Sequence, residues 1–399
     1  MVETVIEVES GWLRVESKDS DLRLFHTLNS QPETLDFSMT TLSMHPELGR
    51  EVSVGSIDKE LRKLWEEDEA RTNASLMNLA IYSEAPGALE KNSAAIRELT
   101  AEHACRAILV GIDRNAPEAS IRAWITAHCH LSHGKKSVCC EQIAFALTGK
   151  ATGRLRNTVF AHLASDLPLI LWWQGELSPR FEDRLYSLVD RFVFDSADWA
   201  EPVESFGRIS DAIQSATREL VVQDLSWTRC FQFRVSVAAL FDDPLVLAAL
   251  PEIETVEIVH HPANRQTALQ MLAWLAVQAG WRDGMELDLA VKRRNGNKEG
   301  FSFEGAGGKS IAATVISDEN AAPLGLVKLS GGGVTVSVSR DAGASSLTRR
   351  IEAPGHVVEA PGPVDPDTPA SLIGEQLARG GKNTLFQKIL PRFRQLLER

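Results

Sequence analysis

The stretch DLPLILWWQGELSPRFEDRLYSLVDRFVFDSADW, Asp166–Trp199, decides the fold class of this chain. Leu169–Trp173 is an apolar run after Pro168, bounded by Gly175 and Pro179, which is typical of a buried strand. Apolar residues at helical spacing predict a helix over Phe181–Val189, and Phe192–Phe194 predicts a second strand. Strand–helix–strand is the repeating unit of a layered α/β sheet.

The residues on either side of this unit extend the same pattern. We expect helices over 57–69, 88–100, 156–163 and 203–222, and strands over 76–82, 106–112, 121–128 and 137–147. A hairpin-like loop joins the last two strands. The first fold prediction is therefore α/β, a mixed sheet with covering helices.

The pattern changes after Asp224. Trp227–Phe241 predicts an amphipathic helix that ends at Pro244, and a strand over 255–259 and a helix over 265–281 follow. Period-two segments separated by Gly-rich turns then predict an antiparallel meander, with strands at 285–292, 310–316, 325–329, 334–339 and 347–352. A Pro-rich connector, 354–369, precedes two short helices. The second fold prediction is an α+β domain.

Length and charge suggest how these parts are organised. A chain of 399 residues is too long for one ordinary core. Residues 1–70 hold 16 acidic and 7 basic residues, so they carry −9 of the total net charge of −12. We expect an acidic, partly ordered extension over 1–54, an N-terminal α/β domain over 55–222 and a C-terminal α+β domain over 223–399.

Composition disfavours several classes of protein. Apolar residues make up 44% and charged residues 24%, as in soluble globular proteins, and no stretch is apolar for the length of a membrane span. Basic clusters are too short for nucleic-acid binding. The start of the chain does not resemble a secretory signal, and five cysteines without a regular framework fit a reducing cytoplasm.

Motifs for a bound cofactor are weak. GAGGKS, 305–310, has Phe303 where a P-loop requires glycine, and it opens a strand instead of a helix, so a hairpin turn is the better interpretation. The turn after the first strand, 82–87, lacks the glycines that let a pyrophosphate approach the backbone. We expect no cofactor, no metal and no catalytic residue.

The predicted hairpin, residues 128–140, carries three histidines and three cysteines that could serve redox or metal chemistry. Neighbouring residues of a strand point to opposite faces, so at most one of Cys139 and Cys140 can meet Cys129. Three interpretations stay open, in this order: ordinary buried and surface cysteines, a thiol switch, and a zinc site with His128, His130 and His133.

Tryptophan and arginine are typical anchors of protein interfaces. Trp172 and Trp173 follow each other in a predicted strand, so they must face opposite sides. Trp227 and Arg229 open the second domain. These four residues are the predicted partner-binding residues, with burial in the core as the even alternative.

Several segments together resemble the glucose-6-phosphate dehydrogenase assembly protein family, OpcA. They are IDKELRKLW (57–65), TNASLMNLAIYSE (72–84), HACRAILVGID (103–113), VCCEQIAFALTG (138–149), DLPLILWWQGE (166–176), LVDRFVFDSADW (188–199) and DLSWTRCFQFRVSVAALFDDP (224–244). The resemblance implies a non-catalytic protein that binds glucose-6-phosphate dehydrogenase, promotes its active oligomer and acts as its effector where the oxidative pentose phosphate pathway begins. The alternative is an α/β enzyme or a thiol or metal sensor that uses the hairpin around 128–140.

Overall fold

The computed structural model describes residues 6–9, 12–15, 44–66, 71–73, 75–132, 136–283 and 296–399. The chain divides into two compact units, Met1–Thr41 and Leu42–Arg399. In the first unit, β1 (Ile6–Glu9) pairs with β2 (Trp12–Val15) in antiparallel register.

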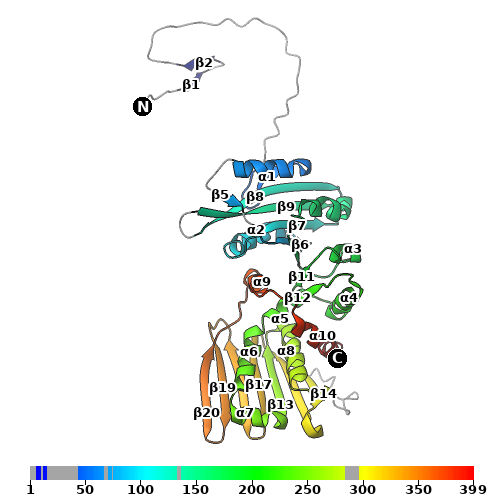
Figure 1. Ribbon diagram of the computed structural model, residues 1–399, viewed down its shortest axis with the longest axis vertical. Helices are drawn as coiled ribbons and strands as arrows, with labels where there is room; N and C mark the ends of the chain where they lie inside the picture. The colour runs from blue at the N-terminus through cyan, green and yellow to red at the C-terminus, as the bar shows by residue number, and fades with distance from the viewer. Residues whose placement is uncertain are drawn as a thin grey trace. The chain divides into compact units, whose positions relative to one another are not determined.

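The first sheet has a parallel half and an antiparallel half (Figure 1). Its parallel strands, in spatial order, are β12 (Val221–Asp224), β11 (Arg191–Phe194), β10 (Leu169–Trp173), β6 (Asn78–Ser83), β7 (Arg106–Asp113) and β9 (Lys136–Thr148). The chain leaves β6 toward β7 on one side and later reaches β10 on the other. The strand order therefore reverses between β6 and β10, as in doubly wound folds.

The antiparallel half begins where β9 pairs with β8 (Ser120–Ser132), which gives the predicted hairpin. β4 (Gly49–Val52) pairs with β8, and β3 (Met44–His45) pairs with β4. β5 (Arg71–Asn73) adds to the free edge of β9. Residues 44–52, which the sequence pattern places in the acidic extension, thus contribute two strands to the sheet.

Helices cover both faces of the parallel half, so β6 and β10 are buried along their whole length. On one face α2 (Ala88–Leu99) and α9 (Pro369–Ala378) pack with Leu79, Leu109 and Trp172. On the other face α1 (Ile57–Glu66) and α4 (Pro202–Ser215) pack with Tyr82 and Trp173. The predicted α/β class with covering helices is confirmed.

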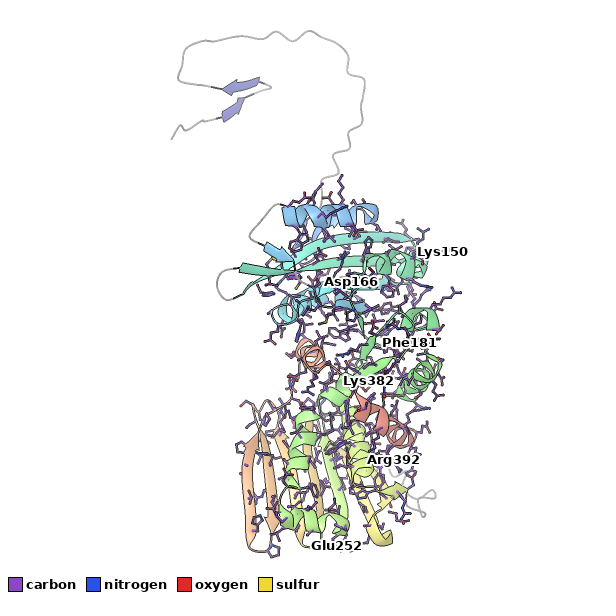
Figure 2. All side chains as sticks on the ribbon, in the orientation of Figure 1. Lys150, Asp166, Phe181, Glu252, Lys382 and Arg392 are labelled. Atoms are coloured by element: carbon purple, nitrogen blue, oxygen red, sulfur yellow. A yellow bond between two sulfur atoms is a disulfide. The ribbon has the colours of Figure 1, made fainter. Side chains whose placement is uncertain are left out.

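Three of the predicted helices of this half differ in the structure. The helix expected over 181–189 is only α3 (Asp183–Tyr186). Phe181, labelled in Figure 2, lies before it in a turn, where its N–H donates to the Ser178 carbonyl. The centre of the Phe181 ring lies 4.8 Å from that of Phe192. The helix expected over 203–222 ends at Ser215, and its last residues become β12. The helix expected over 156–163 is a series of short irregular turns: η2 (Gly149–Arg154), η3 (Leu155–Val159) and η4 (Phe160–His162).

The segment after β12 starts with two helices where one is predicted. α5 (Leu225–Thr228) and α6 (Phe231–Leu240) are separated at Cys230, whose backbone is not helical. The sequence pattern also misses α7 (Pro244–Ala249), which Asp243 caps by accepting the Leu245 N–H. β13 (Ile253–His260) and α8 (Arg265–Gln278) lie close to their predicted ranges.

The second sheet has the strand order β14-β15-β16-β13-β17-β18-β19-β20. Its meander is antiparallel as predicted and comprises β17 (Ala321–Gly331), β18 (Val334–Asp341), β19 (Leu347–Ala353) and β20 (His356–Gly362). Residues 354–369 were expected to form a connector, but residues 356–362 of this segment form β20. A turn at Gly355 folds the chain back, so that β20 pairs with β19. β16 (Ser310–Ser317) runs parallel to β13.

The remaining strands of this sheet lie at its other edge. β14 (Arg282–Asp283) pairs with β15 (Lys298–Glu304), which forms a hairpin with β16. The hairpin turn holds the GAGGKS motif, so the hairpin interpretation is confirmed. The strand predicted over 285–292 lies outside the described residues. The α+β prediction for this part is confirmed.

The last helix joins the two sheets into one core. α10 (Thr384–Leu397) packs against α8 and α4, and the Phe393 ring lies 4.8 Å from Phe206. The predicted division at residues 222 and 223 falls inside β12 and stays a prediction. Among the described helices, none combines the length and apolar character that a membrane span requires.

Candidate functional site

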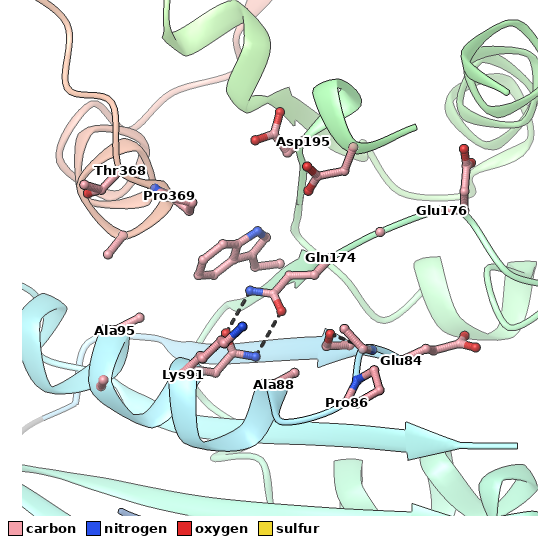
Figure 3. Close-up of a pocket in the computed structure, with 18 of the residues that line it drawn as sticks. Glu84, Pro86, Ala88, Lys91, Ala95, Gln174, Glu176, Asp195, Thr368 and Pro369 are labelled. Atoms are coloured by element: carbon pink, nitrogen blue, oxygen red, sulfur yellow. Dashed lines mark hydrogen bonds between the residues drawn. The ribbon is translucent and has the colours of Figure 1, made fainter. Parts of the chain in front are cut away.

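A cavity of about 890 Å³ lies at the carboxyl ends of the parallel strands, beside the point where the strand order reverses. Figure 3 shows α2 with Ala88, Lys91 and Ala95 on one side, Thr368 and Pro369 at the start of α9 on another, and Asp195 across from α2. Doubly wound sheets bind their ligands at this place. We call it the switch-point cavity.

In a nucleotide-binding doubly wound fold, the turn after the first strand holds a phosphate. The turn after β6 differs from such a turn in sequence. It reads Ser83-Glu84-Ala85-Pro86-Gly87, and Pro86 has no N–H to offer an anion. The Glu84 carboxylate accepts a hydrogen bond from the Tyr82 hydroxyl at 2.6 Å and forms an ion pair with Arg114. Burial raises the pKa of Tyr82 to about 12, so its hydroxyl stays a donor. A carboxylate thus stands where a nucleotide-binding fold places a phosphate.

Two side-chain amides close one wall of the cavity. Asn92 Nδ2 donates to Gln174 Oε1 at 3.0 Å, and Gln174 Nε2 donates to Asn92 Oδ1 at 2.8 Å (Figure 3). Asn92 comes from α2 and Gln174 directly follows β10, so the pair fixes the helix to the carboxyl edge of the sheet. Each amide keeps further hydrogen-bonding capacity for a ligand.

Carboxylates gather at the end of β11. Asp195 accepts two hydrogen bonds from the Arg229 guanidinium, and both side chains are almost completely buried. Bidentate geometry of this kind is the strongest form of ion pair. Asp198, which also lines the cavity, has its pKa raised by desolvation and by the nearby Asp195 carboxylate, and it forms no ion pair within the described residues.

Asp224, at the end of β12, links the carboxyl edge of the first sheet to the residues that follow β12, which we call the second part of the chain. Its carboxylate accepts from the Ser196 and Ser226 N–H groups, from the Ser196 hydroxyl at 2.6 Å and from Gln270 Nε2 at 2.5 Å. Desolvation raises the pKa of Asp224 to about 6, and Asp195 adds to the rise. Because Gln270 belongs to α8, this buried carboxylate joins the carboxyl edge of the first sheet to a helix of the second part.

The four predicted partner-binding residues are all inside the fold. The exposed fractions are 3% for Trp172, 0% for Trp173 and 3% for Trp227, and 9% for the Arg229 side chain. Trp172 and Trp173 do face opposite sides of the sheet, but helices cover both sides. Of these four residues, only Trp172 lines the switch-point cavity. Asp195, the ion-pair partner of Arg229, lines it as well.

Trp227 has an internal role that the sequence pattern does not reveal. The buried guanidinium of Arg234 stacks 3.3 Å from the centre of its indole ring and donates to the Trp227 carbonyl. Desolvation lowers the pKa of Arg234. This cation–π contact holds α5 against α6, so Trp227 belongs to the core of the second part in this structure.

The hairpin brings Cys129 and Cys139 directly opposite each other, and their Sγ atoms form a disulfide. Cys140 is buried on the other face, where desolvation raises the pKa of its thiol. His128 bonds Gln142 at 2.9 Å and His130 bonds Thr100 at 3.1 Å. Across the described ranges no cluster of three or more His, Cys, Asp or Glu side chains could hold a metal ion, and His133 lies outside those ranges.

Sequence analysis overlooks the residues that make this edge polar: Asn92, Gln174, Asp195, Asp198 and Asp224. A signal was present, because Asp195 directly follows the apolar run Phe192–Phe194, and Asp224 follows Val221 and Val222 after one glutamine. In a parallel sheet such residues meet at one edge. The parallel pairing of β12 was the missing step, since 203–222 was expected to be helical.

Comparison with known proteins identifies the class. Residues 96–211 match the domain family described as glucose-6-phosphate dehydrogenase subunit N-terminal domain, and residues 220–390 match the corresponding C-terminal domain. The chain belongs to this OpcA family.

Two relatives carry the name OxPP cycle protein OpcA. The protein from Nostoc punctiforme is 28% identical over 189 residues, which cover 46% of this chain and 40% of the relative. The protein from a Synechocystis strain is 24% identical over 305 residues, which cover 73% of this chain and 63% of the relative. The chain therefore spans less than two thirds of the length of either relative.

Solved structures resemble the chain only distantly. A 3-ketoreductase from Actinomadura kijaniata is 12% identical with a TM-score of 0.45, covering 79% of this chain and 94% of that chain. An aldose-aldose oxidoreductase from Caulobacter crescentus is 14% identical with a TM-score of 0.43, covering 81% and 96%. Similarity at this level carries no conclusion about activity.

Proposed function

We propose that this protein is a non-catalytic effector that binds glucose-6-phosphate dehydrogenase and activates it, either by promoting its active oligomer or by allosteric coupling. The family to which the chain belongs is named for a subunit of that dehydrogenase. An effector changes an enzyme only by binding its active state more tightly than its inactive state.

The observation that carries the non-catalytic part of the proposal is the turn after β6. A dinucleotide approaches a doubly wound sheet through glycine N–H groups at a helix N-terminus. Here Glu84 and Pro86 occupy that turn, and the neighbouring Asp195 carboxylate is committed to Arg229. This chemistry opposes a pyrophosphate and supports recognition of another protein.

Binding is tested by mixing the purified protein with the cognate dehydrogenase. We expect one complex that elutes earlier than either protein alone on size exclusion at micromolar concentrations. Separate elution of the two proteins at every ratio would exclude a stable complex. Multi-angle light scattering of the complex then distinguishes a changed dehydrogenase oligomer from simple attachment of the effector.

The disulfide favours a second function, thiol-dependent control at the hairpin. Cys129 is exposed while Cys139 is buried, so a reductant has access to one sulfur of the bond. In this version the effector binds the dehydrogenase with a strength that depends on the Cys129–Cys139 bond. Equal complex formation by reduced and oxidised protein would reject it.

A further inference from the structure

A second cavity, of about 670 Å³, lies directly beyond α9. We call it the α9 cavity. It shares Glu98, Ala370 and Ser371 with the switch-point cavity, so the two are neighbours across the first turn of α9. Together the two cavities enclose far more space than a single side chain fills. An extended polypeptide segment is the kind of ligand that fills neighbouring recesses of this kind.

The lining of this combined recess is strongly acidic. Eight carboxylate residues line the two cavities, against one lysine, Lys91, and one histidine, His103. Three of these carboxylates are balanced by ion pairs with Arg114, Arg229 and Arg379. In the part of the chain that the structure describes, Glu98, Glu102, Glu176 and Asp198 form no ion pair. The eighth carboxylate, Asp365, is buried and accepts the Gln232 N–H.

This acidity is local. Residues 71–399 carry a net charge of only −3, so the recess is not simply one part of a uniformly acidic surface. Its walls also include apolar groups, among them the Trp172 indole, Ala95 and Pro369. Acidic groups set in an apolar recess favour a ligand that brings both apolar side chains and positive charge.

We propose that the switch-point cavity and the α9 cavity together bind an extended, basic and apolar segment of the partner protein. That the partner is the dehydrogenase rests on the proposed function above. The basic side chains of the segment lie near Glu98 and Glu102, and its apolar side chains pack on Ala95 and Trp172. Complementary charge accelerates and orients such an encounter, and salt weakens it.

Three variants test the site. Glu98→Lys with Glu102→Lys reverses two exposed charges, one at the shared wall and one in the α9 cavity, and Ala95→Trp fills the recess without a change of charge. The control, Glu254→Lys with Glu319→Lys, makes the same charge change at exposed positions of the second part. Thermal unfolding first establishes that all variants fold.

The expected result is a dissociation constant for the dehydrogenase that rises about tenfold or more in both site variants and stays within about twofold in the control. The charge variant should also show a weaker dependence on salt. If wild type binds the dehydrogenase and both site variants bind it equally well, the proposed recess is wrong while the proposed function stands.

A peptide probe decides the case in which wild type does not bind the dehydrogenase. A fluorescein-labelled octapeptide of alternating Arg and Leu is titrated by anisotropy beside its Glu and Leu counterpart. Binding of the basic peptide alone, lost in both site variants, supports the recess after the proposed function has failed. Equal binding of the two peptides, or no loss in the variants, overturns it.

Discussion

In the parallel half of the first sheet, β6 and β10 are buried along their whole length, and buried carboxylates gather at the carboxyl edge, as at Asp195 and Asp224. In the antiparallel half, β8 and β4 carry polar side chains on an open surface, for example the pair Arg122–Glu51 at 2.8 Å. The same sheet therefore concentrates buried charge at one end and spreads exposed charge over the other. Removing a polar group should cost stability at the first place and little at the second.

The largest expected effect tests whether the antiparallel edge belongs to the core. A chain that begins at Gly55 loses β3 and β4, together with the buried side chains of Leu48 and Val52. Compared with a chain that begins at Leu42, its free energy of unfolding in urea should fall by about 5 kcal/mol, which is the sum expected for two large apolar side chains and their hydrogen bonds. Equal unfolding midpoints would show that residues 42–54 are dispensable for the core.

The next effect concerns the carboxyl edge. Asp224→Ala leaves two N–H groups, a hydroxyl and the Gln270 amide without their acceptor, so we expect a loss of about 3 kcal/mol in the free energy of unfolding. Glu254→Ala, an exposed carboxylate, serves as control and should change stability by less than about 0.5 kcal/mol. Similar small losses for both variants would contradict the contrast between buried and exposed charge.

The pH dependence sharpens the same contrast. The folded-state pKa of Asp224, about 6, lies above the ordinary value of 3.8, because burial opposes the charged form. The folded state holds the Asp224 proton more tightly than the unfolded state. The resulting stabilisation of the fold is therefore complete below pH 3.8 and is lost as pH rises through about 6. Between pH 4 and pH 7, the free energy of unfolding of Asp224→Asn should therefore fall by about 2 kcal/mol less than that of wild type. Parallel stability–pH curves would refute the assignment.

The smallest expected effect lies at the antiparallel end. Cys129→Ser removes the disulfide, but the ladder between β8 and β9 remains, so oxidised wild type should exceed the variant by only about 1 kcal/mol. Reduced wild type should match the variant. Mass spectrometry that finds Cys129, Cys139 and Cys140 all as thiols after mild oxidation would remove the basis of the thiol-dependent function.

Periodicity predicted the buried strands and the meander because continuous apolar runs and period-two alternation are local signals. It failed at 203–222, where Val221 and Val222 complete a parallel sheet whose other strands are distant in the sequence. It also failed at 354–369, where pairing of β20 with β19 outweighs the prolines of that segment.

The same dependence on distant parts of the chain explains why the sequence left the burial of the predicted partner-binding residues open. Trp172, Trp173, Trp227 and Arg229 are interface-type residues by composition, but their burial depends on helices contributed from elsewhere in the chain. The hairpin was predictable from a short loop between two strands, and so was the option that Cys129 faces Cys139. The switch-point cavity was not, because it requires the spatial order of β6 and β10.

The central claim is that the protein acts on glucose-6-phosphate dehydrogenase by contact and has no dehydrogenase activity of its own. Steady-state kinetics of the cognate dehydrogenase, measured with and without a saturating amount of the purified protein, test it most directly. We predict no turnover by the protein alone and a rise in kcat/KM of about fivefold or more in the mixture, which corresponds to a typical coupling free energy. Unchanged kinetics of the dehydrogenase at all concentrations of the protein would contradict it.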